Sequence, residues 1–155
     1  MLIHAGASGV GLAAVQLAKA AGAKPLVTAG SADKIAAAVR LGAVGGADRH
    51  EGPWAEKIAA LTSGEGVSLI LDCVGASYWE MNAEVLAIDG RWVLYGLLGG
   101  PTVEGPILGK LLRKRVQLLA TTLRARPLKY RRELVRRFTE EALPSLINGS
   151  FRYVC

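Results

Sequence analysis

The stretch LIHAGASGVGLAAVQLAKAA, residues 2–21, decides the fold. A short apolar run, Leu2–Ala5, leads into the glycine pattern Gly6–Gly11, and apolar residues then recur at helical spacing from Val10 to Ala21. This order predicts a buried strand, a tight turn and a helix. The first N–H groups of such a helix, with its partial positive charge, suit a phosphate, and glycines allow the backbone to approach it. The spacing is G-x-x-G-x-G rather than G-x-G-x-x-G, so a turn made only for packing is the alternative.

The rest of the chain alternates apolar runs with helical patterns, which is typical of βαβ units and a parallel sheet. Further strands are expected at Pro25–Ala29, Val44–Ala47, Val67–Val74, Arg91–Gly96 and Val116–Leu123. Helices are expected at Ala32–Leu41, Pro53–Thr62, Ser77–Ala87, Leu108–Leu112 and Lys129–Ala142. The pattern predicts an α/β, Rossmann-type doubly wound parallel six-stranded sheet. We expect one domain over residues 1–150, with residues 151–155 starting a missing C-terminal segment, because both ends look truncated.

Composition narrows the function classes. Hydrophobic residues make up 51% of the 155 and charged residues 21%, as in ordinary globular domains. We expect no membrane segment and no secretion signal. The two cysteines, Cys73 and Cys155, lie far apart, which favours a reducing, cytoplasmic setting over a disulfide framework. Cysteines and histidines lack the spacing of metal ligands, so no metal site is expected.

The net charge of +6 is unevenly distributed. Residues 110–137 hold eleven basic residues and one acid, whereas the rest holds eight basic and twelve acidic residues. Such a stretch could contact nucleic acid, but no aromatic interleaving or recognised motif accompanies it. We therefore interpret it mainly as a solvated helix face and expect no nucleic-acid partner.

The end of the second predicted strand indicates which dinucleotide would bind. Sites that prefer NAD place Asp or Glu there, to bind the ribose hydroxyls. Here the strand ends in Thr28–Ser31 with no acid before Asp33; Lys34 follows directly, and Arg49 comes after the third predicted strand. A hydroxyl and two cations suit a 2′-phosphate, which favours NADP over NAD. The alternative is that Lys34 and Arg49 are ordinary solvated residues.

The carboxyl ends of the fourth and fifth strands should meet the glycine turn at one edge of the sheet, where ligands bind in such folds. Residues there are expected to flank the nicotinamide and its ribose: Cys73, Val74, Tyr95, Gly96 and Leu97. We interpret Asp72 as a carboxylate bonded to backbone rather than a catalytic group. Cys73 fits a small buried residue and His4 a hydrogen-bonded core histidine, while Tyr95 fits either core or pocket wall.

Four runs carry a family resemblance: residues 2–23, 25–34, 69–82 and 89–100. They resemble the zinc-independent quinone oxidoreductases of the medium-chain dehydrogenase/reductase superfamily, most of all the tumour-suppressor-inducible (PIG-type) members. The likeness runs from residue 1 to about 150 and covers the cofactor-binding half only. It implies NADPH-dependent reduction of quinones by hydride transfer. Other glycine-turn families fit less well, because the chain lacks their Tyr-x-x-x-Lys, strand-two acid or Gly-Lys-Ser/Thr signatures.

The resemblance also implies roles for particular residues. In the family, the loop that matches Ala7, Ser8, Gly9 and Val10 holds the pyrophosphate. The residues that match Gly30, Ser31 and Lys34 surround the 2′-phosphate. A further contact, often a tyrosine, falls at Arg49, and Ser8 stands where many relatives have glycine; both are departures from the family pattern.

The family's catalytic domain, which shapes the quinone pocket, is missing here, so no catalytic residue can be assigned. Members typically form homodimers through the edge strand matching Val116–Leu123. The alternative is a truncated, catalytically silent dinucleotide-binding module.

Overall fold

The computed structural model describes residues 1–152, except for the side chain of Ile107. The chain forms two compact units, Met1–Ala120 and Thr121–Cys155, and each is described by itself. The expected start of a further segment at residues 151–155 lies largely outside the described residues. Within the described part, no helix is long and apolar enough to cross a membrane.

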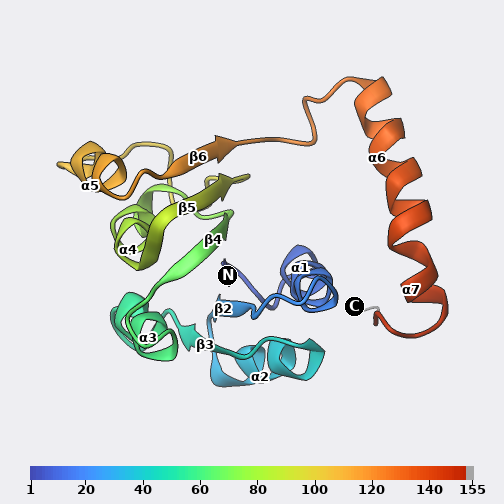
Figure 1. The fold of residues 1–155 in the computed structure, drawn as a ribbon, viewed down its shortest axis with the longest axis horizontal. Coiled ribbons are helices and arrows are strands. Elements are labelled where there is room, and N and C mark those ends of the chain that lie inside the picture. The colour runs from blue at the N-terminus through green and yellow to red at the C-terminus, as the bar shows by residue number, and fades with distance from the viewer. Residues whose placement is uncertain (153–155) are drawn as a thin grey trace. The chain divides into compact units, whose positions relative to one another are not determined.

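The first unit is a six-stranded parallel sheet with the order β3-β2-β1-β4-β5-β6 (Figure 1). Its strands are β1 (Leu2–Ile3), β2 (Leu26–Ala29), β3 (Gly45–Asp48), β4 (Val67–Asp72), β5 (Leu86–Leu94) and β6 (Gln117–Ala120). Its helices are α1 (Gly9–Ala20), α2 (Ala32–Leu41), α3 (Trp54–Leu61), the 3-10 turn η1 (Ala76–Tyr78), α4 (Trp79–Val85) and α5 (Ile107–Arg113). The predicted α/β doubly wound class and all six strands are confirmed.

The shortest strand lies at the centre of the sheet. Leu2 of β1 pairs with Leu26 of β2 on one side and with Ile70 of β4 on the other. The order of strands therefore reverses between β1 and β4, and ligands in open α/β sheets bind at the carboxyl ends of strands beside such a switch point.

The two faces of the sheet carry separate cores, because neighbouring residues on a strand point to opposite faces. Leu2 and Ile70 pack with Trp54 and Ile58 of α3 and with α4. Ile3 packs on the other face, against α1 and α2. Burial on both faces explains why these strands consist of apolar runs rather than an alternating pattern.

Most element bounds differ from the sequence prediction by one to three residues, and three differences go beyond such shifts or have a local cause. The first strand stops at Ile3, because Ala5 adopts a left-handed conformation with φ of 48°. The expected helix over 77–87 is divided into η1 and α4. Strand β5 starts at Leu86 instead of Arg91, since Leu86 pairs with Val67 before the register shifts. The last difference depends on a partner strand and has no local signal.

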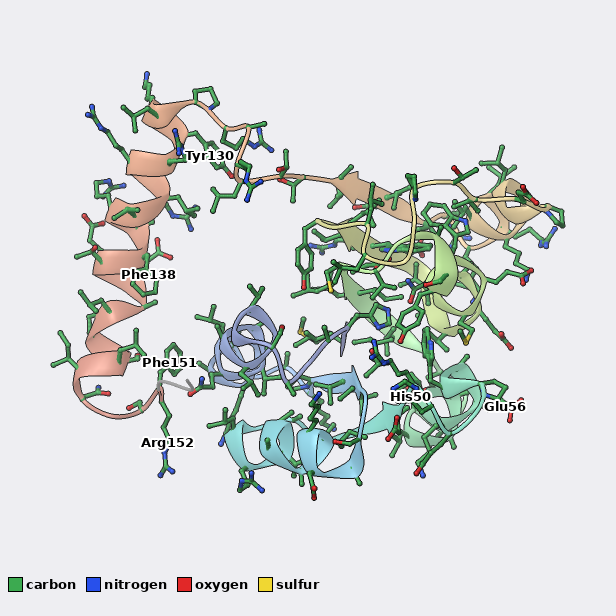
Figure 2. The ribbon with its side chains drawn as sticks, turned by 180° about the vertical axis from the view of Figure 1, so that it is seen from behind. His50, Glu56, Tyr130, Phe138, Phe151 and Arg152 are labelled. Atoms are coloured by element: carbon green, nitrogen blue, oxygen red, sulfur yellow. The ribbon has the colours of Figure 1, made fainter. Side chains whose placement is uncertain are left out.

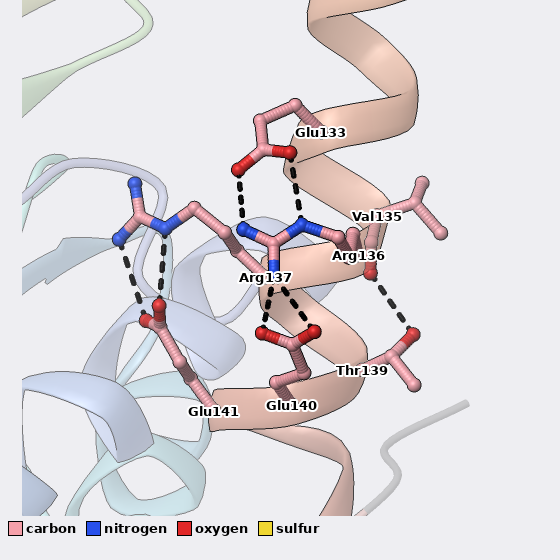
Figure 3. A network of polar contacts seen from close by, with 7 residues as sticks. All are labelled: Glu133, Val135, Arg136, Arg137, Thr139, Glu140 and Glu141. Carbon is pink, nitrogen blue, oxygen red and sulfur yellow. Dashed lines mark hydrogen bonds and ion pairs between the residues drawn. The ribbon is translucent and has the colours of Figure 1, made fainter.

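The second unit holds the basic helix α6 (Leu128–Glu141) and a short helix, α7 (Leu143–Ile147), that was not predicted. Tyr130 and Phe138 project from α6 (Figure 2). Arg136 lies between Glu133 and Glu140 and forms ion pairs with both, and Arg137 pairs with Glu141 (Figure 3). These pairs are exposed, so much of this helix's charge is balanced on its own solvated surface.

Candidate functional site

A cleft of about 530 Å³ opens at the carboxyl ends of β1, β2 and β4. Fourteen residues line it, and they come from the end of β2 and from the segments that follow β1, β2, β3, β4 and β5. They are Ala5, Ala7, Ser8, Thr28, Ala29, Gly30, Lys34, Arg49, His50, Val74, Ser77, Tyr78, Leu98 and Gly99. The cleft therefore lies at the position that the strand order predicts for a ligand site.

The glycine turn forms one wall. Ser8 caps α1, and its Oγ accepts a hydrogen bond from the N–H of Gly11 at 3.0 Å. A Cβ added at Gly11 would collide with the carbonyl oxygen of Ala5, whereas one added at Gly9 would meet nothing within 4 Å. Gly11 is thus required by packing, and Gly9 leaves open space at the helix start. Ser8, which stands where many members of the resembled family have glycine, stabilises the helix start as its cap.

Cationic and polar side chains also line the cleft. Ser31 caps α2 by accepting from the N–H of Lys34 at 3.3 Å, which fixes the first turn that carries Lys34. Arg49 follows β3, and its Nε donates to Nε2 of His50 at 3.2 Å. The N–H of His50 is held by Asp48 Oδ1 at 2.9 Å. Figure 2 labels His50 directly after β3.

A buried polar network lies beneath the cleft. His4 is fully buried, with Nδ1 2.8 Å from Thr28 Oγ1 and Nε2 2.7 Å from Asn82 Oδ1. Burial lowers the pKa of His4, against the opposing effects of its Asn82 hydrogen bond and the charge of Asp72. The prediction of a hydrogen-bonded core histidine is confirmed.

Asp72 bonds backbone, as predicted: its Oδ1 accepts from the N–H groups of Val74 and Gly75 at 2.7 and 3.0 Å. Its Oδ2 accepts from Asn82 and from Trp92, each at 3.0 Å. The carboxylate therefore organises the turn after β4 and holds the indole of β5 to it.

Tyr78 connects this network to the cleft. Its ring lies 4.8 Å from His4 and 5.1 Å from Trp54 between ring centroids. Burial raises the pKa of Tyr78, and the positive charge of Arg49 opposes that rise.

Six of the thirteen residues expected to contact a cofactor line the cleft: Ala7, Ser8, Gly30, Lys34, Arg49 and Val74. The other seven do not: Gly9, Val10, Ser31, Cys73, Tyr95, Gly96 and Leu97. Gly9, Val10 and Ser31 adjoin lining residues in the chain. Cys73 is buried, as predicted, and burial raises the pKa of its thiol. Gly96 packs on Cys73, and burial also raises the pKa of the Tyr95 hydroxyl. Cys73, Tyr95 and Gly96 therefore belong to the packing beside the cleft and not to its lining. Contacts to a cofactor remain predictions for all thirteen.

Eight further residues line the cleft: Ala5, Thr28, Ala29, His50, Ser77, Tyr78, Leu98 and Gly99. Leu98 and Gly99 end the segment from Tyr95 that was expected beside the nicotinamide, and the other six were not predicted to line the site. Most adjoin residues that were singled out, and extending each motif by one or two positions would have found them. Tyr78 is different, because it lies six positions beyond the end of β4 and reaches the cleft through η1. Residues 1–152 include no group of three or more His, Cys, Asp or Glu arranged to hold a metal ion.

Comparisons with known proteins give consistent matches. The profile of the family described as "Zinc-binding dehydrogenase" matches residues 9–140. The "Quinone oxidoreductase" of Salmonella typhimurium is 40% identical over 120 residues, which is 77% of this chain and 36% of that protein. The chain thus spans about a third of the length of this relative and of "Quinone oxidoreductase 1" of Escherichia coli.

Solved structures match over nearly the whole chain. Escherichia coli quinone oxidoreductase complexed with NADPH has a TM-score of 0.85 and 32% identity, covering 99% of this chain and 47% of that one. A putative enoyl reductase domain of a polyketide synthase has a TM-score of 0.77 and 29% identity, covering 99% of this chain and 83% of that one.

Proposed function

We propose that this chain, which belongs to the zinc-binding dehydrogenase family, binds NADPH and supplies the cofactor half of a quinone reductase. The relatives named as quinone oxidoreductases and the NADPH-bound structure support the proposal. The observation that carries it is the cleft itself, which is lined both by the capped start of α1 and by Lys34 and Arg49. No carboxylate is among the described residues that line it, as a bound phosphate requires.

In this proposal, residues 1–150 form the cofactor domain, and separate parts of the cleft bind the pyrophosphate and the 2′-phosphate. The backbone from Ala7 to Val10 binds the pyrophosphate at the start of α1. Gly30, Ser31, Lys34 and Arg49 surround the 2′-phosphate, with charge-assisted hydrogen bonds from the two cations.

The turns after β4 and β5 would flank the nicotinamide and its ribose, through Cys73, Val74, Tyr95, Gly96 and Leu97. NADPH, when bound, supplies the hydride. The chain's own part is to orient that cofactor and exclude water from one side of it. No acid or base of the chain is assigned to the reaction, and the chemistry is proposed to need no zinc.

Titration with NADPH and NADH tests the cofactor assignment. Quenching of tryptophan fluorescence should show tighter binding of NADPH, because Trp54 lies against Tyr78 at the cleft. Equal affinities for the two nucleotides, or no binding of either, would overturn the proposal.

A second candidate function is that of a catalytically silent dinucleotide-binding module, since no acid or base of the described residues is assigned to the reaction. Mixing the chain with NADPH and a benzoquinone, and following loss of nicotinamide absorbance, separates the two. We expect saturable NADPH binding with weak or no turnover in the 155-residue chain. Turnover equal to that of a full-length relative would contradict this expectation.

We further propose a homodimer that pairs through β6, in a reducing, cytoplasmic setting. Strand β6 is an edge strand, and Leu118 and Leu119 on it are 41% and 49% exposed. An apolar edge with unpaired backbone groups favours pairing with another strand. Sedimentation of the chain and of Leu119→Lys tests this, since the substitution should shift a dimer to monomer. A monomer at all concentrations before substitution would refute it.

A further inference from the structure

Three side-chain nitrogen atoms lie together at the end of β2, beside Gly30. A Cβ added at Gly30 would lie 3.3 Å from Arg49 Nε, 3.6 Å from Arg49 Nη2 and 3.4 Å from His50 Nε2. These are the nearest heavy atoms to that point apart from Gly30 itself and its chain neighbours. Sites that prefer NAD place a carboxylate at this end of the second strand, to bind the ribose hydroxyls. In this chain the corresponding place is lined by nitrogen atoms instead.

The backbone holds Arg49 and His50 in this position. Strand β3 ends at Asp48, which pairs with Ala29, and the N–H of Arg49 then donates to the Ala29 carbonyl oxygen at 2.9 Å. The N–H of His50 donates to Asp48 Oδ1, also at 2.9 Å. Arg49, His50 and Gly30 all line the cleft. The two side chains therefore extend from a well-supported backbone at the place where a ribose substituent would bind.

The hydrogen bond between the two side chains fixes the position of the proton on His50. Arg49 Nε donates to His50 Nε2 at 3.2 Å, and a guanidinium has donors only. His50 Nε2 must therefore be unprotonated, so the imidazole is neutral and carries its proton on Nδ1. A second proton would have to enter at Nε2, where it would break this bond and place two positive charges side by side. Without a ligand, Arg49 thus favours the neutral form of His50.

A phosphate dianion bound here would reverse that preference. It can accept from Arg49 and from a protonated His50 together, and its charge favours the imidazolium. The charged or titratable groups around His50 are Asp48, Arg49 and Glu51 along the chain, and Lys34 and Tyr78, which line the same cleft. The acids favour the imidazolium and the cations oppose it whether or not a ligand is bound, so the change on binding comes from the phosphate. Phosphate binding and proton uptake then favour each other by the same factor.

We propose that His50 is a specificity-determining residue that contacts the nucleotide's 2′-phosphate in its protonated form, so that the preference for NADPH over NADH increases as the pH falls. The inference rests on the proposed NADPH binding and adds to the 2′-phosphate site a residue that the family resemblance did not indicate. NADH has a hydroxyl group in place of the 2′-phosphate and brings no charge to this position. With NADH bound, His50 therefore stays neutral and paired with Arg49.

The test measures affinities for NADP⁺ and NAD⁺ by calorimetric titration at about pH 8 and about pH 6.5, a range in which histidine ordinarily changes its charge. The two nucleotides differ only in the 2′-phosphate, whose second pKa of about 6 keeps most of it dianionic in this range. In the unmodified chain, the ratio of NADP⁺ to NAD⁺ affinity should rise by about three- to fivefold toward the lower pH, as an added charge-assisted hydrogen bond allows. In His50→Gln the ratio should stay level or fall, because the amide can accept from Arg49 but takes up no proton.

Proton uptake gives a second readout of the same contact. Titrations at about pH 7 in buffers with different ionisation enthalpies count the protons that bind together with each nucleotide. NADP⁺ should bring more protons than NAD⁺ to the unmodified chain, and this excess should be absent in His50→Gln. Arg49→Ala is the matched variant on the other side of the hydrogen bond. It should lower the affinity ratio at both pH values, while the rise toward the lower pH remains because His50 is still present.

The outcomes separate the inference from the proposed function on which it rests. Circular dichroism checks that His50→Gln is folded, as expected for the substitution of an exposed residue. If the affinity ratio rises equally in the unmodified chain and in His50→Gln, or rises in neither, the inference alone is overturned. If the unmodified chain shows no preference for NADP⁺ at either pH, the proposed function is overturned instead.

Discussion

His4 Nε2 lies 2.7 Å from Asn82 Oδ1, although 78 positions separate the two residues in the chain. The bond joins the central strand β1 to helix α4 and leaves the imidazole no contact with solvent. A histidine in this setting makes folding sensitive to pH.

Stability should decline as the pH falls below the ordinary histidine pKa of 6.5. Burial lowers the pKa of His4 in the folded state, so the unfolded chain takes up a proton first. The contribution is fully present above 6.5 and is lost as the pH falls toward the folded value. Urea unfolding between about pH 5.5 and about pH 8 measures it.

His4→Gln should flatten that pH dependence at the cost of some stability near pH 8, since the amide does not titrate in this range. The exposed His50 offers the matched control, and His50→Gln should keep the slope of the unmodified chain. An equally steep slope in His4→Gln would show that another group is responsible.

Trp92 and Trp54 are both buried, but only one has a partner for its indole nitrogen. Trp92 Nε1 donates to Asp72 Oδ2, whereas Trp54 Nε1 has no hydrogen-bond partner among the described residues. Trp92→Phe should therefore be less stable than Trp54→Phe by about 1.5–3 kcal/mol, the range for a hydrogen bond to a charged group. Thermal and urea unfolding of the pair measures the difference. Equal losses would mean that the indole bond to Asp72 contributes nothing.

Alanine substitutions at two glycines of the turn should have different effects, one on stability and the other on NADPH affinity. Gly11→Ala forces a Cβ against the Ala5 carbonyl oxygen and should destabilise the fold by about 1–3 kcal/mol. Gly9→Ala meets nothing and should keep or raise stability, because alanine favours the helix. The added methyl group would occupy the space proposed for the pyrophosphate, so NADPH affinity should fall by about 1 kcal/mol or more. Full NADPH affinity in Gly9→Ala would remove the pyrophosphate from this turn.

Lys34→Ala should narrow the affinity gap between NADPH and NADH by about 1–2 kcal/mol, through loss of a charge-assisted hydrogen bond. Lys57→Ala removes the same charge from α3, away from the lining of the cleft, and should leave the gap unchanged. Calorimetric titration at one fixed salt concentration compares the variants. Equal narrowing by both would indicate only a general effect of net charge.

Capping and terminating residues in the sequence predicted the bounds of the elements that they begin or end. Helix α2 matches its predicted bounds, Ala32–Leu41, because Ser31 caps its start and Gly42 ends it with a φ of 123°. The glycine turn was recognisable for the same reason, since its chemistry lies within six consecutive residues. The fold class followed from the alternation of such elements.

Residues brought together by the fold were not predictable in this way. Tyr78 and His50 follow different strands, and only the strand order places both in one cleft. Cys73 and Tyr95 follow strands at the correct edge, yet Cys73 is buried and neither side chain lines the cleft. Spacing along the chain indicates which edge a residue reaches, but not whether it faces the cleft or the core.

The two-residue length of β1 has a consequence for how the chain folds. Leu2 and Ile3 join the β2–β3 part of the sheet to the β4–β5–β6 part, through pairs with residues 26–27 and 70–71. Along the chain, β1 lies close to its neighbour β2 but nearly seventy residues before its other neighbour, β4. Loops of that length close slowly. We therefore expect the joining of the two parts to limit the folding rate, and substitutions at Ile3 or Ile70 to slow refolding more than they speed unfolding.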